Sequence, residues 1–281
     1  MIIASVGQRL TTFIDGRSVD VERESGGRFP SDIAAVYPRW DEFRKWADEI
    51  GAKGSAEIAP NSLDSLSPQP SQVFGIGLNY RDHAIEANLA IPDFPVTFAK
   101  FPSCIVGPGT PVDVAGPTTD WEVELVIVIG RQAFQVPKSD AWDHVAGLTI
   151  GQDISERTRQ LEGPVPQYSL GKSFPGYGPI GPWLVTPDEL KDPDDLAIRC
   201  LLNGEVVQES RTSQLIFSVS DLVAQLSSVL TLMPGDLIFS GTPGGVGWFR
   251  SPQRFLEPGH ELVSEIEGIG QLTTSFVAPP R

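Results

Sequence analysis

The chain has 281 residues, of which 40% are hydrophobic and 20% are charged, a balance typical of a globular protein with a sizeable core. Acidic residues outnumber basic ones by 36 to 21, and the formal charge of −15 excludes nucleic acid as a partner, because that binding relies on neutralising phosphates with Lys and Arg. An anionic substrate would be repelled at long range, so it needs a locally positive site, which a bound divalent cation would supply.

The first 70 residues are expected to form a small N-terminal domain and a linker. Segments Thr11–Ile14 and Ser18–Val21 flank Asp15-Gly16, which predicts a β-hairpin with a D-G turn. Residues Asp41–Ile50 predict a short amphipathic helix that ends at Gly51. The composition of Pro60–Gln72, rich in Pro and Ser, is typical of a linker.

Residues 71–281 are expected to form a second, catalytic domain. Apolar, β-branched runs recur there between Gly and Pro turns, and we predict a strand at each: Val73–Gly77, Thr97–Lys100, Val123–Ile129, Ala146–Gln152, Ala197–Leu202, Leu237–Phe239 and Glu261–Ile266. A helix is predicted over Asp221–Leu230, with Ser220 as its N-cap. This pattern indicates mixed β with short helices (α+β), arranged as a barrel or a folded, mixed sheet.

Only two cysteines occur, Cys104 and Cys200, which provide neither a disulfide framework nor a zinc site and suit a reducing compartment. The first nine residues lack the long apolar region of a signal peptide, and no run approaches 18 apolar residues. We therefore expect a cytoplasmic protein with no membrane partner.

Three carboxylates stand at the ends of two apolar strands. Glu122 and Glu124 are two residues apart, so both side chains leave the same face of the first strand, and Asp153 follows the second strand. Adjacent carboxylates repel one another unless a cation holds them. An oxygen-only ligand set suits Mg²⁺ or Mn²⁺, and Ca²⁺ less well. The alternative is that these residues are solvent-facing charges at the edge of a sheet.

His83 and Glu86 lie three residues apart on a short helix that follows the strand Val73–Gly77. At this spacing the carboxylate can orient the imidazole and raise its basicity, as a general base for water requires. The alternative is an ordinary surface pair. The other histidines, His144 and His260, lie in sequences typical of surface turns.

Two loops carry further candidates. Lys172 lies in a loop rich in Gly and Pro, where it would bind a substrate carboxylate or a developing enolate beside a metal, or would simply be a solvated lysine. The Gly-rich segment 240–247 would offer free N–H groups and the Thr242 hydroxyl to an anion, or would be only a tight turn. Gly75-x-Gly77 lacks the third glycine of a dinucleotide site.

In this order, the segments resemble the fumarylacetoacetate hydrolase (FAH) family from about Val73 to Val277. The matching motifs are Gly77-Leu78-Asn79-Tyr80 with His83 and Glu86, Lys100-Phe101-Pro102-Ser103, Val106-Gly107-Pro108-Gly109, Trp121-Glu122-Val123-Glu124-Leu125, Gln152-Asp153-Ile154-Ser155-Glu156-Arg157, Gly171-Lys172-Ser173-Phe174 and Ser240-Gly241-Thr242-Pro243-Gly244-Gly245-Val246-Gly247. Within the family the chain resembles acylpyruvases and 2-hydroxyhepta-2,4-diene-1,7-dioate isomerases.

The resemblance implies a β-roll catalytic domain, a homodimer and a role in the catabolism of aromatic compounds. It implies a metal held by the three carboxylates and a His83–Glu86 dyad on a mobile lid helix. Lys172 would act in catalysis, and Tyr80, Gln160 and Thr242 would contact the substrate. Thr158 departs from the Asp of many members, and residues 175–179 depart from the usual pattern, so the substrate side differs from many relatives.

On this basis we expect a divalent-metal hydrolase that cleaves a 2,4-dioxo acid, such as an acylpyruvate, into pyruvate and a carboxylic acid. The metal would chelate the 2-oxo acid, His83 would activate water, and Lys172 would stabilise the enolate. The alternatives are an oxaloacetate decarboxylase or tautomerase, an isomerase or dehydratase of a 2-oxo acid, and a non-catalytic metal-binding relative.

Overall fold

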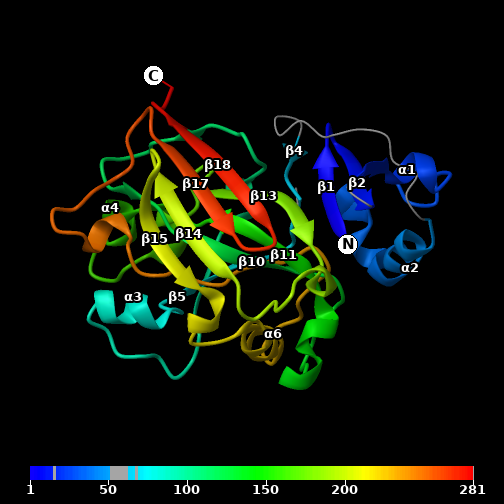
Figure 1. The fold of residues 1–281 in the computed structure, drawn as a ribbon. Helices are drawn as coiled ribbons and strands as arrows, with labels where there is room; N and C mark the ends of the chain where they lie inside the picture. Colours follow the sequence, from blue (N-terminus) through cyan, green and yellow to red (C-terminus); the bar gives the residue numbers. More distant parts are fainter. Residues whose placement is uncertain (15–16, 51–62, 67–68, 281) are drawn as a thin grey trace.

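Two β-sheets of unequal size make up most of the molecule, and short helices lie at their edges (Figure 1). The computed structural model describes residues 1–14, 17–50, 63–66 and 69–280. The expected α+β class, mixed β with short helices, is confirmed. None of the helices in the described ranges is long and apolar enough to cross a bilayer.

The larger sheet has 11 strands. Its main order is β3 (Arg17–Asp20), β2 (Arg9–Ile14), β1 (Ile2–Val6), β13 (Gly178–Val185), β11 (Val145–Gln152), β10 (Val123–Ile129), β16 (Leu237–Phe239), β5 (Val73–Gly77) and β6 (Val96–Ala99). Two more strands join from the side, β4 (Leu63–Asp64) on β1 and β7 (Ile105–Val106) on β13.

The five-stranded sheet runs in the order β15 (Glu205–Arg211), β14 (Ala197–Leu202), β17 (Glu261–Ile266), β18 (Gly270–Val277) and β8 (Val112–Asp113). A small ladder pairs β9 (Thr119–Asp120) with β12 (Ser155–Glu156). The α-helices of the described residues are α1 (Val21–Glu24), α2 (Trp40–Ile50), α3 (Arg81–Glu86), α4 (Arg157–Gln160), α5 (Tyr168–Gly171) and α6 (Val219–Ser227).

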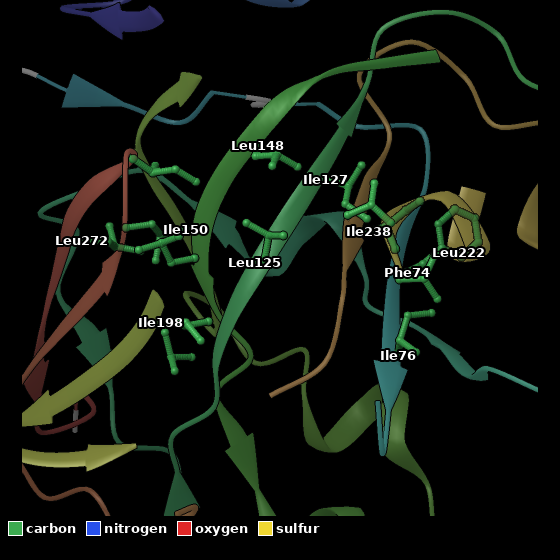
Figure 2. Packing of buried hydrophobic residues seen from close by; sticks show 14 of the residues in the cluster. Phe74, Ile76, Leu125, Ile127, Leu148, Ile150, Ile198, Leu222, Ile238 and Leu272 are labelled. Carbon is green, nitrogen blue, oxygen red and sulfur yellow. The ribbon is translucent and has the colours of Figure 1, made fainter. Parts of the chain in front are cut away.

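Strand β10 is buried on both of its faces, which explains its continuous apolar sequence. Leu125 and Ile127 belong to a hydrophobic cluster that also includes Leu222 of α6 (Figure 2). Val126 and Val128 belong to a second cluster. Since successive side chains of a strand point to opposite faces, β10 separates the two cores.

The N-terminal residues supply the second cluster and extend the larger sheet. Strand β1 pairs antiparallel with β13, so the sheet continues from the catalytic region into the N-terminal hairpin. Phe29, Phe43 and Trp46 pack against one another with ring centroids 5.5–5.9 Å apart, and they share a cluster with Val126 and Val128. The N-terminal unit therefore covers one face of β10.

Most of the predicted elements are present. The hairpin appears as β2 paired with β3, and its D-G turn lies outside the described residues. The amphipathic helix appears as α2, with Trp40, Phe43, Trp46 and Ala47 buried. Of the predicted linker, residues 63–66 and 69–72 are described, and part of them forms β4. The domain boundary near residue 70 stays a prediction.

The predicted N-cap of α6 is wrong. The helix begins at Val219, and Ser218 is its N-cap, in a capping box with Asp221. The Ser218 hydroxyl accepts from the Asp221 N–H at 3.3 Å, and the Ser218 N–H donates to the Asp221 carboxylate at 3.1 Å. Both serines stand at the start of the apolar run, and the reciprocal bond of Ser218 with Asp221 decides between them.

This correction predicts unequal effects for two matched substitutions. Ser218→Ala removes the cap and should lower the free energy of unfolding by about 1 kcal/mol. Ser220→Ala changes a residue inside the helix, where Ala is the better helix former, and should not lower it. Urea denaturation of both variants measures the difference, and an equal loss in the two would contradict the assignment of the cap.

Candidate active site

The three predicted carboxylates meet at the ends of β10 and β11. The two strands pair antiparallel with Val123 opposite Gln152, and the Asp153 N–H donates to the Glu122 carbonyl at 2.9 Å. Oxygen atoms of Glu122, Glu124 and Asp153 all lie within 4.8 Å of one another. The three residues are only 6%, 1% and 1% exposed, so the alternative of solvent-facing charges is wrong.

Three buried cations surround this carboxylate triad. The Lys172 ammonium lies 2.6 Å from Glu122 Oε2 and 2.7 Å from Asp153 Oδ2. Lys100 Nζ lies 2.6 Å from Asp153 Oδ1. Arg157 Nη2 lies 2.7 Å from Glu122 Oε1. Lys172 is therefore not a solvated loop lysine, while Lys100 and Arg157 are site residues to which the sequence analysis gave no role.

Asp120 holds Arg157 and a wall of the site in place. Its carboxylate accepts from Arg157 Nε at 2.9 Å, from the Gly247 N–H at 2.7 Å and from the Trp248 N–H at 3.0 Å. Asp120 is fully buried. One carboxylate thus fixes both the guanidinium that contacts Glu122 and the loop that carries Trp248 and Phe249.

The charges of the site leave room for a cation. Four buried carboxylates, those of the triad and Asp120, face the three cations Lys100, Lys172 and Arg157, which leaves a net charge of −1. Buried charges are costly unless they are paired. A divalent cation at the triad would turn this charge to +1, and three carboxylate oxygens form the ligand type that Mg²⁺ and Mn²⁺ prefer. The donor set therefore fits a divalent metal.

The two glutamates of the triad differ in their proton affinity. Burial alone would raise the pKa of Glu122, but the charges of Lys172 and Arg157 outweigh it and lower that pKa to about 2. Burial raises the pKa of Glu124 well above its ordinary value, and the charges of Asp153 and Glu122 raise it further. Without a cation, Glu124 is the carboxylate that takes a proton.

The turn after β16 binds two of the site carboxylates through its backbone. The Gly241 N–H donates to Glu124 Oε2 at 2.8 Å, and the Gly245 N–H donates to Glu86 Oε1 at 2.9 Å. Gly241 has a φ of +101°, and a Cβ there would lie 2.7 Å from Asn79 Cβ, so this position requires glycine. These two N–H groups, which we expected to be free for a ligand, are taken by the chain's own carboxylates.

His83 and Glu86 form the expected pair on α3. His83 Nδ1 lies 3.1 Å from Glu86 Oε2, and a carboxylate can only accept, so Nδ1 is the nitrogen that donates in this pair. The imidazole packs edge-on against Phe249, with ring centroids 5.8 Å apart. His83 is therefore oriented, as a general base must be, and the expected mobility of α3 stays a prediction.

A cavity of about 310 Å³ brings five of the predicted residues to one surface. His83, Glu122, Gln160, Lys172 and Thr242 all line it. Glu124 and Asp153 are buried beside Glu122, behind this surface. The cavity therefore has a polar floor at the carboxylate triad.

The three residues predicted to contact the substrate lie in different environments. Gln160 Oε1 accepts from Arg157 Nη1 at 3.1 Å, and the described residues offer no acceptor to its Nε2. The Thr242 hydroxyl donates to the Val123 carbonyl at 2.9 Å and accepts from Gln208 Nε2 at 2.8 Å, so only one lone pair is left for a ligand. Tyr80 is fully buried and does not line the cavity.

The chain belongs to the fumarylacetoacetate hydrolase family. Residues 72–277 match the family described as fumarylacetoacetate (FAA) hydrolase C-terminal. The match covers the whole site, from β5 to the last strand, and agrees with the resemblance seen in the sequence.

Named relatives differ in their reactions. The chain is 45% identical over 226 residues to human oxaloacetate tautomerase FAHD2A, mitochondrial, covering 78% of this chain and 72% of that protein. A Mycobacterium smegmatis protein described as HpcE has a solved structure with 49% identity and a TM-score of 0.95, with full coverage of both chains. A maleylpyruvate hydrolase from Sphingobium sp. SYK-6, solved with manganese(II) ion and pyruvate, has 25% identity and a TM-score of 0.83, with full coverage of both chains.

The raised pKa of Glu124 predicts that protons and a divalent cation compete for the site. Mn²⁺ affinity should rise with pH through the range in which Glu124 loses its proton, and binding should release about one proton. Calorimetric titrations at several pH values, in buffers with different enthalpies of ionisation, count this proton. Glu124→Gln should abolish the release and weaken binding, whereas the exposed Glu162→Gln should change neither. Wild-type binding without proton release would contradict the assignment.

Proposed function

We propose that this protein is a divalent-metal enzyme that forms and protonates the enolate of a 2-oxo acid, and so interconverts its keto and enol forms. The observation that carries the proposal is one cavity lined by Glu122 of the carboxylate triad, by Lys172 and by the oriented His83. The human relative, named for oxaloacetate tautomerisation, supports this choice of reaction.

The floor of the cavity would receive the acid end of the substrate. A divalent cation held by Glu122, Glu124 and Asp153 would supply Lewis-acid stabilisation of the enolate oxygen. Lys172 would contribute a second positive charge to this oxygen from within the same site, and Gln160 Nε2 would donate to the carboxylate. The residues would thereby offset the repulsion between an anionic substrate and an acidic protein.

His83 would move the proton. In the keto form, Nε2 would take a proton from carbon 3, and the electron pair of that C–H bond would form the carbon–carbon double bond while the 2-oxo oxygen gains the negative charge. Return of the same proton from the imidazolium to this oxygen would give the enol and restore the base. Glu86 would stabilise the imidazolium that forms, because its carboxylate lies on the opposite ring nitrogen.

Hydrolysis of a 2,4-dioxo acid, the reaction expected from the sequence, is the second candidate. The oriented His83–Glu86 pair favours it, since the same base would take a proton from water that attacks carbon 4. Cleavage between carbons 3 and 4 would leave the enolate of pyruvate on the same floor. A homodimer, a cytoplasmic location, a role in aromatic catabolism and Mg²⁺ as the particular metal stay predictions.

The two reactions have different products, which one set of assays separates. Keto–enol interconversion should remove the enol absorbance of oxaloacetate without forming pyruvate, whereas hydrolysis should release one pyruvate for each acylpyruvate consumed. Either activity should disappear on chelation and return with Mg²⁺ or Mn²⁺. Metal-loaded protein that turns over neither substrate would contradict the proposed function.

His83→Gln should lower the active reaction by ~10²- to 10⁴-fold, because the base is lost while the metal site is intact. His144→Gln is the matched control, since this histidine bonds to the Gln132 carbonyl and does not line the cavity. Steady-state rates and bound metal are measured on both variants. Equal rates in the two variants would remove His83 from the mechanism.

A further inference from the structure

We infer that the outer half of the cavity selects 2-oxo acids whose far end is apolar and discriminates against diacids long enough to place a second carboxylate there, such as 2-oxoglutarate. This inference rests on the proposed function, because it takes the carboxylate triad as the place where the 2-oxo acid end is held.

The buried part of the cavity lining is mainly polar, and its exposed part is mainly apolar. Beyond the floor, the walls are formed mainly by aliphatic and aromatic side chains, which include Leu89, Val96, Phe98, Leu161, Trp248 and Phe249. They come from three separate parts of the chain: the segment from α3 to β6, the residue after α4, and the loop held by Asp120. Three independent segments thus supply the same kind of surface.

The cationic and basic side chains that line the cavity in the described part of the chain are already paired at the floor. Lys172 contacts Glu122 and Asp153, Arg157 contacts Asp120 and Glu122, and His83 contacts Glu86. A carboxylate in the outer half would therefore find no unpaired cation among these lining residues.

Of the arginines close in sequence to the cavity lining, Arg81 is exposed on α3 and does not line the cavity, and the other two are engaged elsewhere. Arg250 donates to the carbonyls of Gly245 and Val207, at 3.2 and 2.7 Å, and Arg159 forms an ion pair with Glu162. Between Ala87 and Val96 the sole charged residue is Asp93, whose charge would repel a carboxylate. This negative charge, together with the lack of an unpaired cation among the lining residues, disfavours a carboxylate in the outer half.

The energetic consequence follows from desolvation. A carboxylate in the outer half would meet only neutral donors, the Tyr168 hydroxyl and the Trp248 indole N–H, and would not recover the hydration that a charge loses on burial. Each CH₂ group buried against apolar walls, in contrast, strengthens binding by about fourfold. The cavity of about 310 Å³ also extends past the polar floor, so that a substituent beyond the 2-oxo acid has walls to contact. An apolar substituent uses these walls, and a second carboxylate does not.

A pair of ligands of nearly equal shape tests the inference. In 2-oxoglutarate the far end is a carboxylate, and in 5-methyl-2-oxohexanoate an isopropyl group takes its place. Both are titrated calorimetrically into the Mn²⁺-loaded full-length protein, with pyruvate as the ligand that has the acid end alone. The branched acid should bind about tenfold or more tightly than 2-oxoglutarate.

A cation placed in the outer half should reverse the preference. Leu89 is 58% exposed at the rim, so Leu89→Arg adds a charge there without disturbing the core. It should strengthen 2-oxoglutarate binding by about tenfold relative to Leu89→Gln, the uncharged control of similar length.

The outcomes separate the two claims. Wild-type protein that binds 2-oxoglutarate as tightly as the branched acid, or a Leu89→Arg variant that gains nothing for 2-oxoglutarate, would overturn the inference while pyruvate binding still supports the proposed function. Wild-type protein that binds none of the three acids in the presence of Mn²⁺ would overturn the proposed function itself.

Discussion

The burial of three like-charged carboxylates at the ends of two paired strands is the constraint on which the rest of the site depends. Charges removed from water must be compensated, and the chain supplies Lys100, Lys172 and Arg157 from three different segments to do so. The compensation stops one charge short once Asp120 is counted, which is the condition under which a divalent cation becomes favourable. The uncompensated charge of the buried carboxylates therefore explains both the ion pairs of the site and its proposed binding of a metal.

The same electrostatic demand connects the metal site to the base. The turn after β16 donates one N–H to Glu124 and another to Glu86, so a single backbone segment fixes a proposed metal ligand and the partner of His83. Asp120 likewise links two parts of the site, because its carboxylate accepts hydrogen bonds from both Arg157 and the loop that carries Trp248. The charged side chains that line the cavity bind one another at its floor, whereas the outer walls are mainly apolar. The proposed reaction and the inferred selectivity therefore rest on the same arrangement of side chains.

Local pattern was enough to predict the buried strands and the residues that they present. Strands β5, β10, β14, β16 and β17 match their predicted bounds, because each is a short apolar run between turns. Strand β13 escaped prediction because Pro179, Gly181 and Pro182 interrupt its sequence, although it lies inside the larger sheet. Lys100 and Arg157 gained their roles only in the fold, since Lys100 meets a partner 53 residues away. Such contacts leave no local signal in one sequence.

The central claim is that the triad holds one divalent cation, and anomalous scattering from crystals grown with Mn²⁺ tests it most directly. The wild-type protein should show one strong peak in contact with oxygens of Glu122, Glu124 and Asp153, and Glu122→Gln crystals grown in the same solution should show none there. A peak that lies elsewhere, or one that persists at the triad in the variant, would contradict the account.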